Sequence, residues 1–504
     1  SEQHADSCAG ASTLAAVSLG GVFEACAQKL VTLHVDLSLG QLYPDIGQMV
    51  LPRLGGMALP TGFSEARSPL RIDLMGGWSD TPPICYELGG AVVNLGVTVA
   101  GRRPLSARCR LFPTPEGKTP EIRLTSLRVS STSDGTYASE SVSCHSYSEL
   151  VAHMDDPQSN QCVLLKAVVL VALGLPVPGS EVECLLPEVF HIFGGCSLEL
   201  VSETSLPSGS GLGGSSVLAA TALRAVEHLL SRAGVAKEAE DWGLGGEREW
   251  GARLRLSAQV SKVEQIMTTG GGWQDQIGAI FPGLKLGVCE HGLPLNVDVI
   301  PLSFDNEALA SQFHRVLESR LFLVYTGRQR LARNCLINAL KRNAATPYRT
   351  GIGDGSANTI STLAEGARAL MHRLQKRASS LQEATAVAII NELNEMVDDI
   401  AATLSCYWEG KRLMAGGSEP HFVSDLFHAV HPVCSGFSLC GAGGGGFATV
   451  ILAQGRCKDE LVSSLLPLKG VSDEGRSELK QFEMFSVLDI EVDTFGIIVE
   501  ILNS

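Results

Sequence analysis

The stretch Pro207-Ser208-Gly209-Ser210-Gly211-Leu212-Gly213-Gly214-Ser215-Ser216 decides how this sequence folds, because it joins two segments of different periodicity. Before it, apolar residues alternate from Cys196 to Glu203, which predicts a half-buried strand. After it, apolar residues recur at helical spacing and Gly234 supplies a stop signal. The helical positions are Ala219, Leu223, Val226 and Leu230. The stretch is therefore predicted to be a glycine-rich loop between a strand and a helix.

Such a loop can bind an anion through its backbone. Glycine permits positive φ and close approach of a ligand, and the following helix N-terminus adds a favourable dipole. We interpret the loop as a phosphate cradle, with a tight turn capped by Ser215 or Ser216 as the alternative. The Walker pattern is absent because no Lys follows the glycines, and the dinucleotide spacing Gly-x-Gly-x-x-Gly fits poorly.

A second glycine cluster, Gly270 to Gly272, separates two carboxylates. Apolar residues at helical spacing from Leu256 to Met267 place Glu264 on a helix, whereas Asp275 follows the glycines. One carboxylate on a helix and one after a turn suit a metal ligand and a general base. The alternative is a solvated Glu264 and an Asp275 that caps the next helix.

A third cluster, Gly441 to Gly446, precedes the apolar segment Phe447 to Leu452, which is predicted to be a strand. Four consecutive glycines remove side chains where a ligand or another loop approaches closely. A flexible hairpin explains the cluster less well because its flanks are so apolar.

Composition restricts the class of protein. The chain has 504 residues, of which 45% are hydrophobic, enough for large buried cores in roughly two to four typical domains. The formal charge of −15 and the scattered Lys and Arg residues argue against a nucleic-acid partner. The longest apolar run, Ala167 to Leu175, is shorter than the roughly 20 residues of a membrane span, so we expect no membrane partner.

The 14 cysteines are spread singly from Cys8 to Cys457, without a Cys-x-x-Cys pair. The first six residues do not begin a signal peptide. We therefore expect reduced thiols and a cytoplasmic protein.

The first and third glycine clusters and one earlier segment resemble the three motifs of the GHMP small-molecule kinases, in the same order. The earlier segment is Arg67-Ser68-Pro69-Leu70-Arg71-Ile72-Asp73-Leu74-Met75-Gly76-Gly77-Trp78-Ser79-Asp80. Within that family the chain is most similar to the kinase half of eukaryotic L-fucose kinases. The resemblance implies an α+β, two-lobed fold, with a ribosomal-protein-S5-like N-terminal lobe over 61–290 and a ferredoxin-like C-terminal lobe over 291–504. Residues 1–60 match none of the motifs and are expected to be a linker or docking segment.

The resemblance also implies roles for individual residues. ATP phosphates would lie on Pro207, Ser208, Gly209, Ser210, Gly211, Leu212, Gly213, Gly214 and Ser215. Mg²⁺ would be held by Ser215 and Glu264, Asp275 would lie beside the accepting hydroxyl, and Arg71 would stabilise the transferred phosphoryl group. The sugar would contact Asp80, Gly76, Gly77, Trp78, Gly443 and Gly444.

The implied reaction is phosphorylation of the anomeric hydroxyl of L-fucose by ATP, giving L-fucose 1-phosphate on the salvage route to GDP-fucose. Gly77 and Trp78 stand where galactokinases have an acidic residue and a histidine, which argues against galactose. A heptose phosphate or arabinose as the acceptor, and a non-catalytic sugar- and nucleotide-binding regulator, stay open. A pyrophosphorylase-like half is expected to precede the chain.

Two further expectations can be checked against a structure. Trp78 and Trp273 flank the implied site and could cover the methyl group of a 6-deoxy sugar, with ordinary core packing as the alternative. The Ser-rich segment from Ser126 to Ser148 is expected to be a surface loop.

Overall fold

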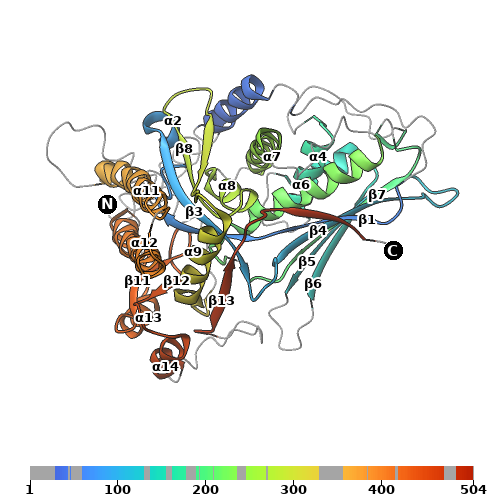
Figure 1. The fold of residues 1–504 in the computed structure, drawn as a ribbon. Helices are drawn as coiled ribbons and strands as arrows, with labels where there is room; N and C mark the ends of the chain where they lie inside the picture. Colours follow the sequence, from blue (N-terminus) through green and yellow to red (C-terminus); the bar gives the residue numbers. More distant parts are fainter. Residues whose placement is uncertain are drawn as a thin grey trace, which may run out of the picture.

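The computed structural model describes residues 26, 29–43, 46, 60–129, 137–154, 162–176, 189–191, 193–207, 209–234, 246–267, 271–328, 356–382, 384–414, 418–469 and 484–502. Two β-sheets, with helices packed against them, make up this part of the chain (Figure 1). Most strand pairs are antiparallel. The predicted α+β class is confirmed.

The first sheet has six strands in the order β14-β1-β4-β7-β5-β6. They span β14 (Ile498–Leu502), β1 (Phe63–Ser68), β4 (Leu105–Phe112), β7 (Ser197–Thr204), β5 (Ile122–Val129) and β6 (Tyr137–Cys144). Against the sheet pack α4 (Val163–Ala172) and α6 (Gly214–Arg232), and α7 (Glu247–Ile266) packs on both helices. The short α3 (Tyr147–Val151) follows β6. One large apolar cluster fills the space between this sheet and its helices.

The second sheet has the order β11-β12-β10-β13-β3-β8-β9, and β2 also pairs with β3. The strands are β11 (Cys434–Leu439), β12 (Phe447–Leu452), β10 (Leu321–Tyr325), β13 (Val487–Val492), β3 (Gly90–Val99), β8 (Leu284–Cys289), β9 (Val297–Pro301) and β2 (Leu70–Met75). β13 joins the sheet's two halves, because its residues 487–489 pair with β10 and 490–492 pair with β3.

The other helices surround this sheet (Figure 1). They are α2 (Ile84–Leu88), α8 (Gln274–Ile280), α9 (Glu307–Arg320), α11 (Ser356–Ser379), α12 (Ala386–Met414), α13 (His421–Val430) and α14 (Lys458–Lys469). Apolar residues of α11 and α12 pack together and against β2, the strand that carries Arg71 and Asp73. The long helices thus support the first of the three predicted motifs from behind.

Most predicted elements appear where the sequence places them: β7, α6, α7 and β12 are confirmed. The Ser-rich segment is a correction. It holds the second half of β5 and the whole of β6, which pair with each other, and Ser126 and Cys144 are buried. Its polar residues suggested a loop, whereas a two-sided strand accommodates polar residues on its outer face.

The predicted lobe boundary at residue 290 stays a prediction. The eight-stranded sheet contains strands from both sides of it, and β14 returns to pair with β1. Within the predicted N-terminal segment, residues 29–42 form a helix. Its Val35 and Leu39 pack against Ala258 of α7, and Asp36 pairs with Lys262.

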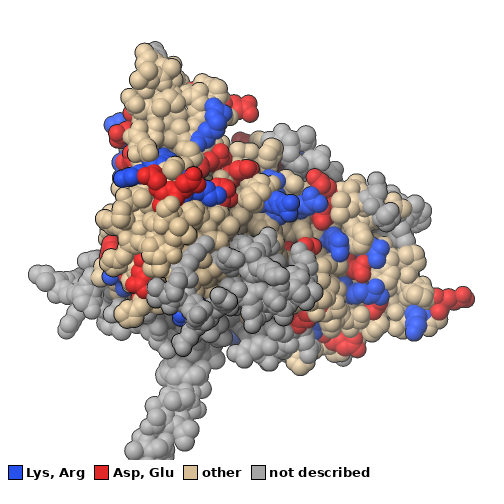
Figure 2. All heavy atoms as spheres, turned by 90° about the horizontal axis from the view of Figure 1, so that it is seen from below, with Lys and Arg blue, Asp and Glu red and all other residues tan. Residues whose placement is uncertain are grey.

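The described surface carries both signs of charge. Figure 2 shows Lys and Arg side chains interspersed with Asp and Glu on one face. Among the helices that the structure describes, none has the combined length and hydrophobicity needed to cross a bilayer.

Candidate active site

The predicted phosphate loop lies between β7 and the N-terminus of α6. Gly209, Gly211 and Gly213 all have positive φ, between 69° and 81°, which L side chains rarely adopt. The loop therefore has the backbone conformation for which its glycines were singled out. Ser208 lies outside the described residues, and Pro207 precedes the gap.

The third glycine run closes over this loop. Phe447 N donates to Ser210 O at 3.0 Å, and a Cβ atom at Gly446 would lie 2.5 Å from the same oxygen. The close approach predicted for the glycine run is thus to the phosphate loop. Gly443 and Gly444 contact Ser418 instead, through a Gly444 N–H donated to Ser418 O at 2.8 Å. Their contact with a sugar stays a prediction.

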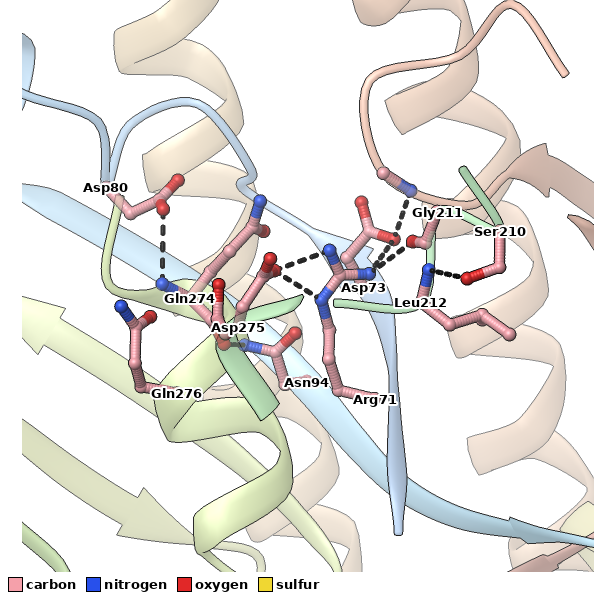
Figure 3. Close-up of polar contacts among 12 residues, drawn as sticks. Arg71, Asp73, Asp80, Asn94, Ser210, Gly211, Leu212, Gln274, Asp275 and Gln276 are labelled. Atoms are coloured by element: carbon pink, nitrogen blue, oxygen red, sulfur yellow. Dashed lines mark hydrogen bonds and ion pairs between the residues drawn. The ribbon is translucent and has the colours of Figure 1, made fainter. Parts of the chain in front are cut away.

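Arg71 and Asp275 meet beside the phosphate loop (Figure 3). Arg71 Nε and Nη2 both donate to Asp275 Oδ1, at 2.8 and 2.5 Å. Arg71 Nη1 donates to Gly211 O at 2.8 Å, so the arginine ties the carboxylate to the loop. A Cβ at Gly213 would lie 3.2 Å from Asp275 Cγ, which puts the carboxylate against the loop backbone. The structure thus brings Arg71 of the first motif into contact with Asp275, from which the sequence separates it by about 200 residues.

α8 presents Asp275 in its first turn, and cations hold the helix at its other end. Lys285 Nζ donates to Phe281 O at 2.6 Å and to Gly283 O at 3.0 Å, and Arg253 donates to Ile280 O. These donors satisfy carbonyl oxygens at the helix C-terminus that have no partner within the helix, so they fix the helix that carries the carboxylate.

Sequence reasoning missed a buried group behind Arg71. Asp73 Oδ2 accepts from Tyr407 Oη and Lys411 Nζ, each at 2.9 Å. Asp73 Oδ1 accepts from Gly441 N at 3.0 Å and from Arg71 Nη1 at 3.3 Å. Burial alone would raise the pKa of Asp73, but Lys411 and Arg71 hold it below its ordinary value. Asp73 stands two residues from Arg71 in the first motif, whereas nothing in the sequence links it to α12.

Glu264 is buried on α7 and accepts hydrogen bonds from Ser216 Oγ and, at 3.0 Å, from Gln276 Nε2. Ser215 is exposed, so the hydroxyl that faces Glu264 belongs to Ser216. The pairing of Ser215 with Glu264 at a metal stays a prediction. Burial, with the charges of Asp275 and Asp80, raises the pKa of Glu264 to about 8.

Asp80 is fully buried, and backbone amides use both of its oxygens. Trp78 N donates to Oδ1 at 2.9 Å and Gln274 N to Oδ2 at 3.1 Å. Burial raises the pKa of Asp80 to about 7. A Cβ at Gly272 would overlap Asp80 Oδ2, so the second glycine cluster fits around this carboxylate. Asp80 therefore holds the first motif against the start of α8, and its contact with a sugar stays a prediction.

The two predicted sugar-contacting glycines of the first motif are packed closely against other elements. A Cβ at Gly76 would overlap Ala91 O, and one at Gly77 would overlap the Tyr407 hydroxyl. Trp78 and Trp273 are each only 5% exposed and pack in the two large apolar clusters. Both tryptophans are thus core residues, and their contact with a sugar stays a prediction.

The site contains two buried carboxyl groups with raised pKa values, Glu264 and Asp80, and the partly exposed carboxylate of Asp275. Among the described residues, no three His, Cys, Asp or Glu side chains are placed to hold a metal ion together. Mg²⁺ usually takes one or two protein carboxylates and completes its shell with water and phosphate oxygens. A single buried Glu264 beside a hydroxyl and a phosphate loop fits that pattern.

Comparison with known proteins agrees with this geometry. Residues 182–283, which include the phosphate loop, Glu264 and Asp275, match the family model described as GHMP kinases N terminal domain. The chain thus carries a domain of the GHMP kinase N-terminal type over these residues.

The names of two curated relatives each describe two activities. The bifunctional fucokinase/GDP-fucose pyrophosphorylase of Arabidopsis thaliana is 27% identical over 400 residues, which are 79% of this chain and 30% of the relative. The L-fucokinase/L-fucose-1-P guanylyltransferase of Bacteroides fragilis is 26% identical over 391 residues, 76% of this chain and 34% of the relative. The chain thus spans about a third of the length of these relatives.

Among solved structures, the galactose complex of Lactococcus lactis galactokinase aligns with a TM-score of 0.48 and 14% identity. The alignment covers 87% of this chain and 95% of that one.

Proposed function

We propose that this chain transfers the γ-phosphoryl group of ATP to the anomeric hydroxyl of L-fucose, giving L-fucose 1-phosphate and ADP. The observation that carries the proposal is the Asp275 carboxylate, tethered by Arg71 to the Gly211 carbonyl of the phosphate loop. A proton acceptor beside a phosphate-binding backbone is what in-line phosphoryl transfer to a hydroxyl needs. The choice of L-fucose is supported by the names of the two curated relatives.

In this proposal Asp275 accepts the proton of the sugar hydroxyl as the hydroxyl oxygen forms its bond to the γ-phosphorus and the bond to ADP breaks. Arg71 has five N–H donors, and the four hydrogen bonds described for it use four of them. One donor on Nη2 is left for an anion. Arg71 therefore positions Asp275 first and stabilises phosphoryl charge with what remains.

Mg²⁺, when bound, would neutralise charge on the ATP phosphates. Glu264 would hold it, together with the hydroxyl of Ser216 or Ser215. The geometry favours Ser216, whose hydroxyl already contacts Glu264. Because the pKa of Glu264 is about 8 in the ligand-free chain, its carboxyl group would release a proton on taking up the ion.

L-fucose 1-phosphate is the substrate named in the second activity of the Bacteroides fragilis relative. We therefore infer that the product of this chain is passed to a guanylyltransfer step, carried by a pyrophosphorylase-like half.

The test is ADP release when ATP, Mg²⁺ and L-fucose are mixed with the protein, with a parallel panel of D-arabinose, galactose and a heptose phosphate. ADP release with L-fucose at the highest kcat/KM supports the proposal. A higher kcat/KM with a heptose phosphate would assign the same chemistry to another sugar. Absence of ADP with every acceptor, while ATP still binds, would point to a regulator.

A further inference from the structure

We propose that Lys411, acting through Asp73, is a positioning residue that keeps Arg71 on one oxygen of Asp275 and leaves the other oxygen open to the acceptor hydroxyl. This inference rests on the proposed kinase function of the same site. It concerns residues on α12, about 340 positions from the first motif, that no sequence pattern connects to the chemistry.

The four side chains form a series of alternating charge. Lys411 Nζ lies 2.9 Å from Asp73 Oδ2, and Arg71 Nη1 lies 3.3 Å from Asp73 Oδ1. Arg71 Nη2 then lies 2.5 Å from Asp275 Oδ1. The first three side chains are at most 3% exposed, whereas Asp275 is 26% exposed. Only the Asp275 end of the series can meet a substrate.

Burying these charges is expensive, and a well-packed apolar group is often as stable as a buried ion pair. Stability alone therefore does not account for a lysine placed at the back of Arg71. Asp73 receives donors on both oxygens, from Lys411, Tyr407, Gly441 and Arg71. Because Asp73 has these other donors, it attracts Arg71 weakly. In agreement, Arg71 lies farther from Asp73 than from Asp275.

Removing the lysine charge should reverse that preference. Asp73 would then have Arg71 as its remaining cation in a nearly dry site, where Coulombic attraction is strong. The guanidinium should move toward Asp73 and loosen its two bonds to Asp275 Oδ1. Asp275 would then lose its fixed orientation beside the phosphate loop.

The two oxygens of Asp275 differ in their contacts. Oδ1 accepts both Arg71 donors, and among the described residues no hydrogen bond reaches Oδ2. The carboxylate lies between Arg71 and the Gln274 side chain in Figure 3. With Oδ1 fixed, rotation of the carboxylate is blocked, and Oδ2 presents its lone pairs in one direction. A fixed orientation raises the reaction rate, because a misplacement of a reacting group by about 1 Å can lower the rate about 100-fold.

The experiment compares Lys411→Met with Lys166→Met. Lys166 is a matched control because it too is 1% exposed, yet its Nζ donates to the backbone carbonyls of Glu149 and Ala152 and it lies on α4. For Lys411→Met we expect kcat to fall by roughly 10- to 100-fold while KM for ATP stays within about twofold. Lys166→Met should lower the stability and leave kcat near that of the parent protein at a temperature where both are folded.

Two further variants keep the inference testable if Lys411→Met folds poorly. Tyr407→Phe removes one donor to Asp73 without a change of charge, and should lower kcat in the same direction by a smaller factor. Asp73→Asn combined with Lys411→Met removes both competing charges, and should regain part of the kcat that Lys411→Met loses. A double variant no faster than Lys411→Met, or a Lys411→Met enzyme with unchanged kcat, would overturn the inference.

A crystal structure of ligand-free Lys411→Met separates this inference from the proposed function. Arg71 Nη1 should lie closer to Asp73, and Arg71 Nη2 farther from Asp275 Oδ1, than in a crystal structure of the parent protein. Unchanged Arg71 contacts would overturn the positioning role even if the protein phosphorylates L-fucose. If Arg71 shifts but the parent protein phosphorylates no sugar, the effect of Lys411 on Arg71 is supported and the proposed kinase function is contradicted.

Discussion

Ser216 donates its hydroxyl to the carboxylate of Glu264, across the contact between the first turn of α6 and the end of α7. Ser215, its neighbour, is exposed. This one-residue difference in helix phase decides which hydroxyl faces Glu264. It also offers a pair of variants that differ little in sequence and strongly in expected effect.

Glu264→Gln should raise the Mg²⁺ concentration needed for half-maximal activity, because the amide removes the anionic ligand and keeps the side chain's shape. Ser216→Ala should do the same to a smaller extent, whereas Ser215→Ala should change the Mg²⁺ requirement less. The measurement is the rate of ADP release as a function of Mg²⁺ at fixed ATP. A Ser215→Ala enzyme with the larger effect would restore the assignment made from the sequence.

Asp275→Asn should abolish most turnover while preserving the fold and ATP binding. The substitution removes the proton acceptor at almost constant volume, and loss of a general base typically costs roughly 10²- to 10⁴-fold in rate. The check is kcat from ADP release, together with the ATP dissociation constant from calorimetry. Asp489→Asn is a fitting control, since that carboxylate is 63% exposed and pairs only with Lys458 among the described residues. Near-normal turnover of Asp275→Asn would contradict the role of Asp275.

The ligand-free protein should become less stable as the pH rises from about 5 to 8. Burial raises the pKa of Glu264 from 4.5 to about 8 and that of Asp80 from 3.8 to about 7. Between those limits the folded chain holds more protons than the unfolded chain, so the free energy of unfolding falls with increasing pH. Urea unfolding at several pH values measures the slope, and Glu264→Gln should flatten it. An equally steep slope in that variant would show that Glu264 titrates normally.

Gly77→Ala should destabilise the chain because its Cβ would overlap the Tyr407 hydroxyl. Overpacking of this kind typically costs about 1–3 kcal/mol. Adding Tyr407→Phe removes the overlapping oxygen, so the double variant should be more stable than Gly77→Ala. The measurement is the free energy of unfolding of the three variants and the parent protein. Simple additivity of the two single effects would mean that position 77 does not meet Tyr407.

The local features were predictable because they depend on neighbours in sequence. The strand, the glycine loop and the helix around Gly211 follow from periodicity and from glycine's access to positive φ. The proximity of Asp275 to the loop required the family resemblance, since about 60 residues separate them. The Ser126–Ser148 segment was misread because one of its buried strand positions, Ser126, is itself a hydroxyl residue and gives no apolar signal.

Lys411 could not have been found from the sequence. A single lysine on a long amphipathic helix normally lies in water, and its burial depends on the packing of α12 against β2. The same holds for Ser216, because the sequence gives two adjacent serines and only the phase of α6 chooses between them. Tertiary contacts between distant segments, rather than propensities, fix these parts of the site.

The place of β13 has a consequence for the order in which this chain can be assembled. Its residues 487–492 are synthesised long after β3 and β10, yet they lie between these strands and join the two halves of the larger sheet. β14 then adds the outer strand beside β1, with Leu502 opposite Phe63. Contacts so distant in sequence form slowly, and domains usually fold as units during translation. The larger sheet must therefore stay in two parts until β13 has left the ribosome, and only then can its two halves join into one cooperative unit.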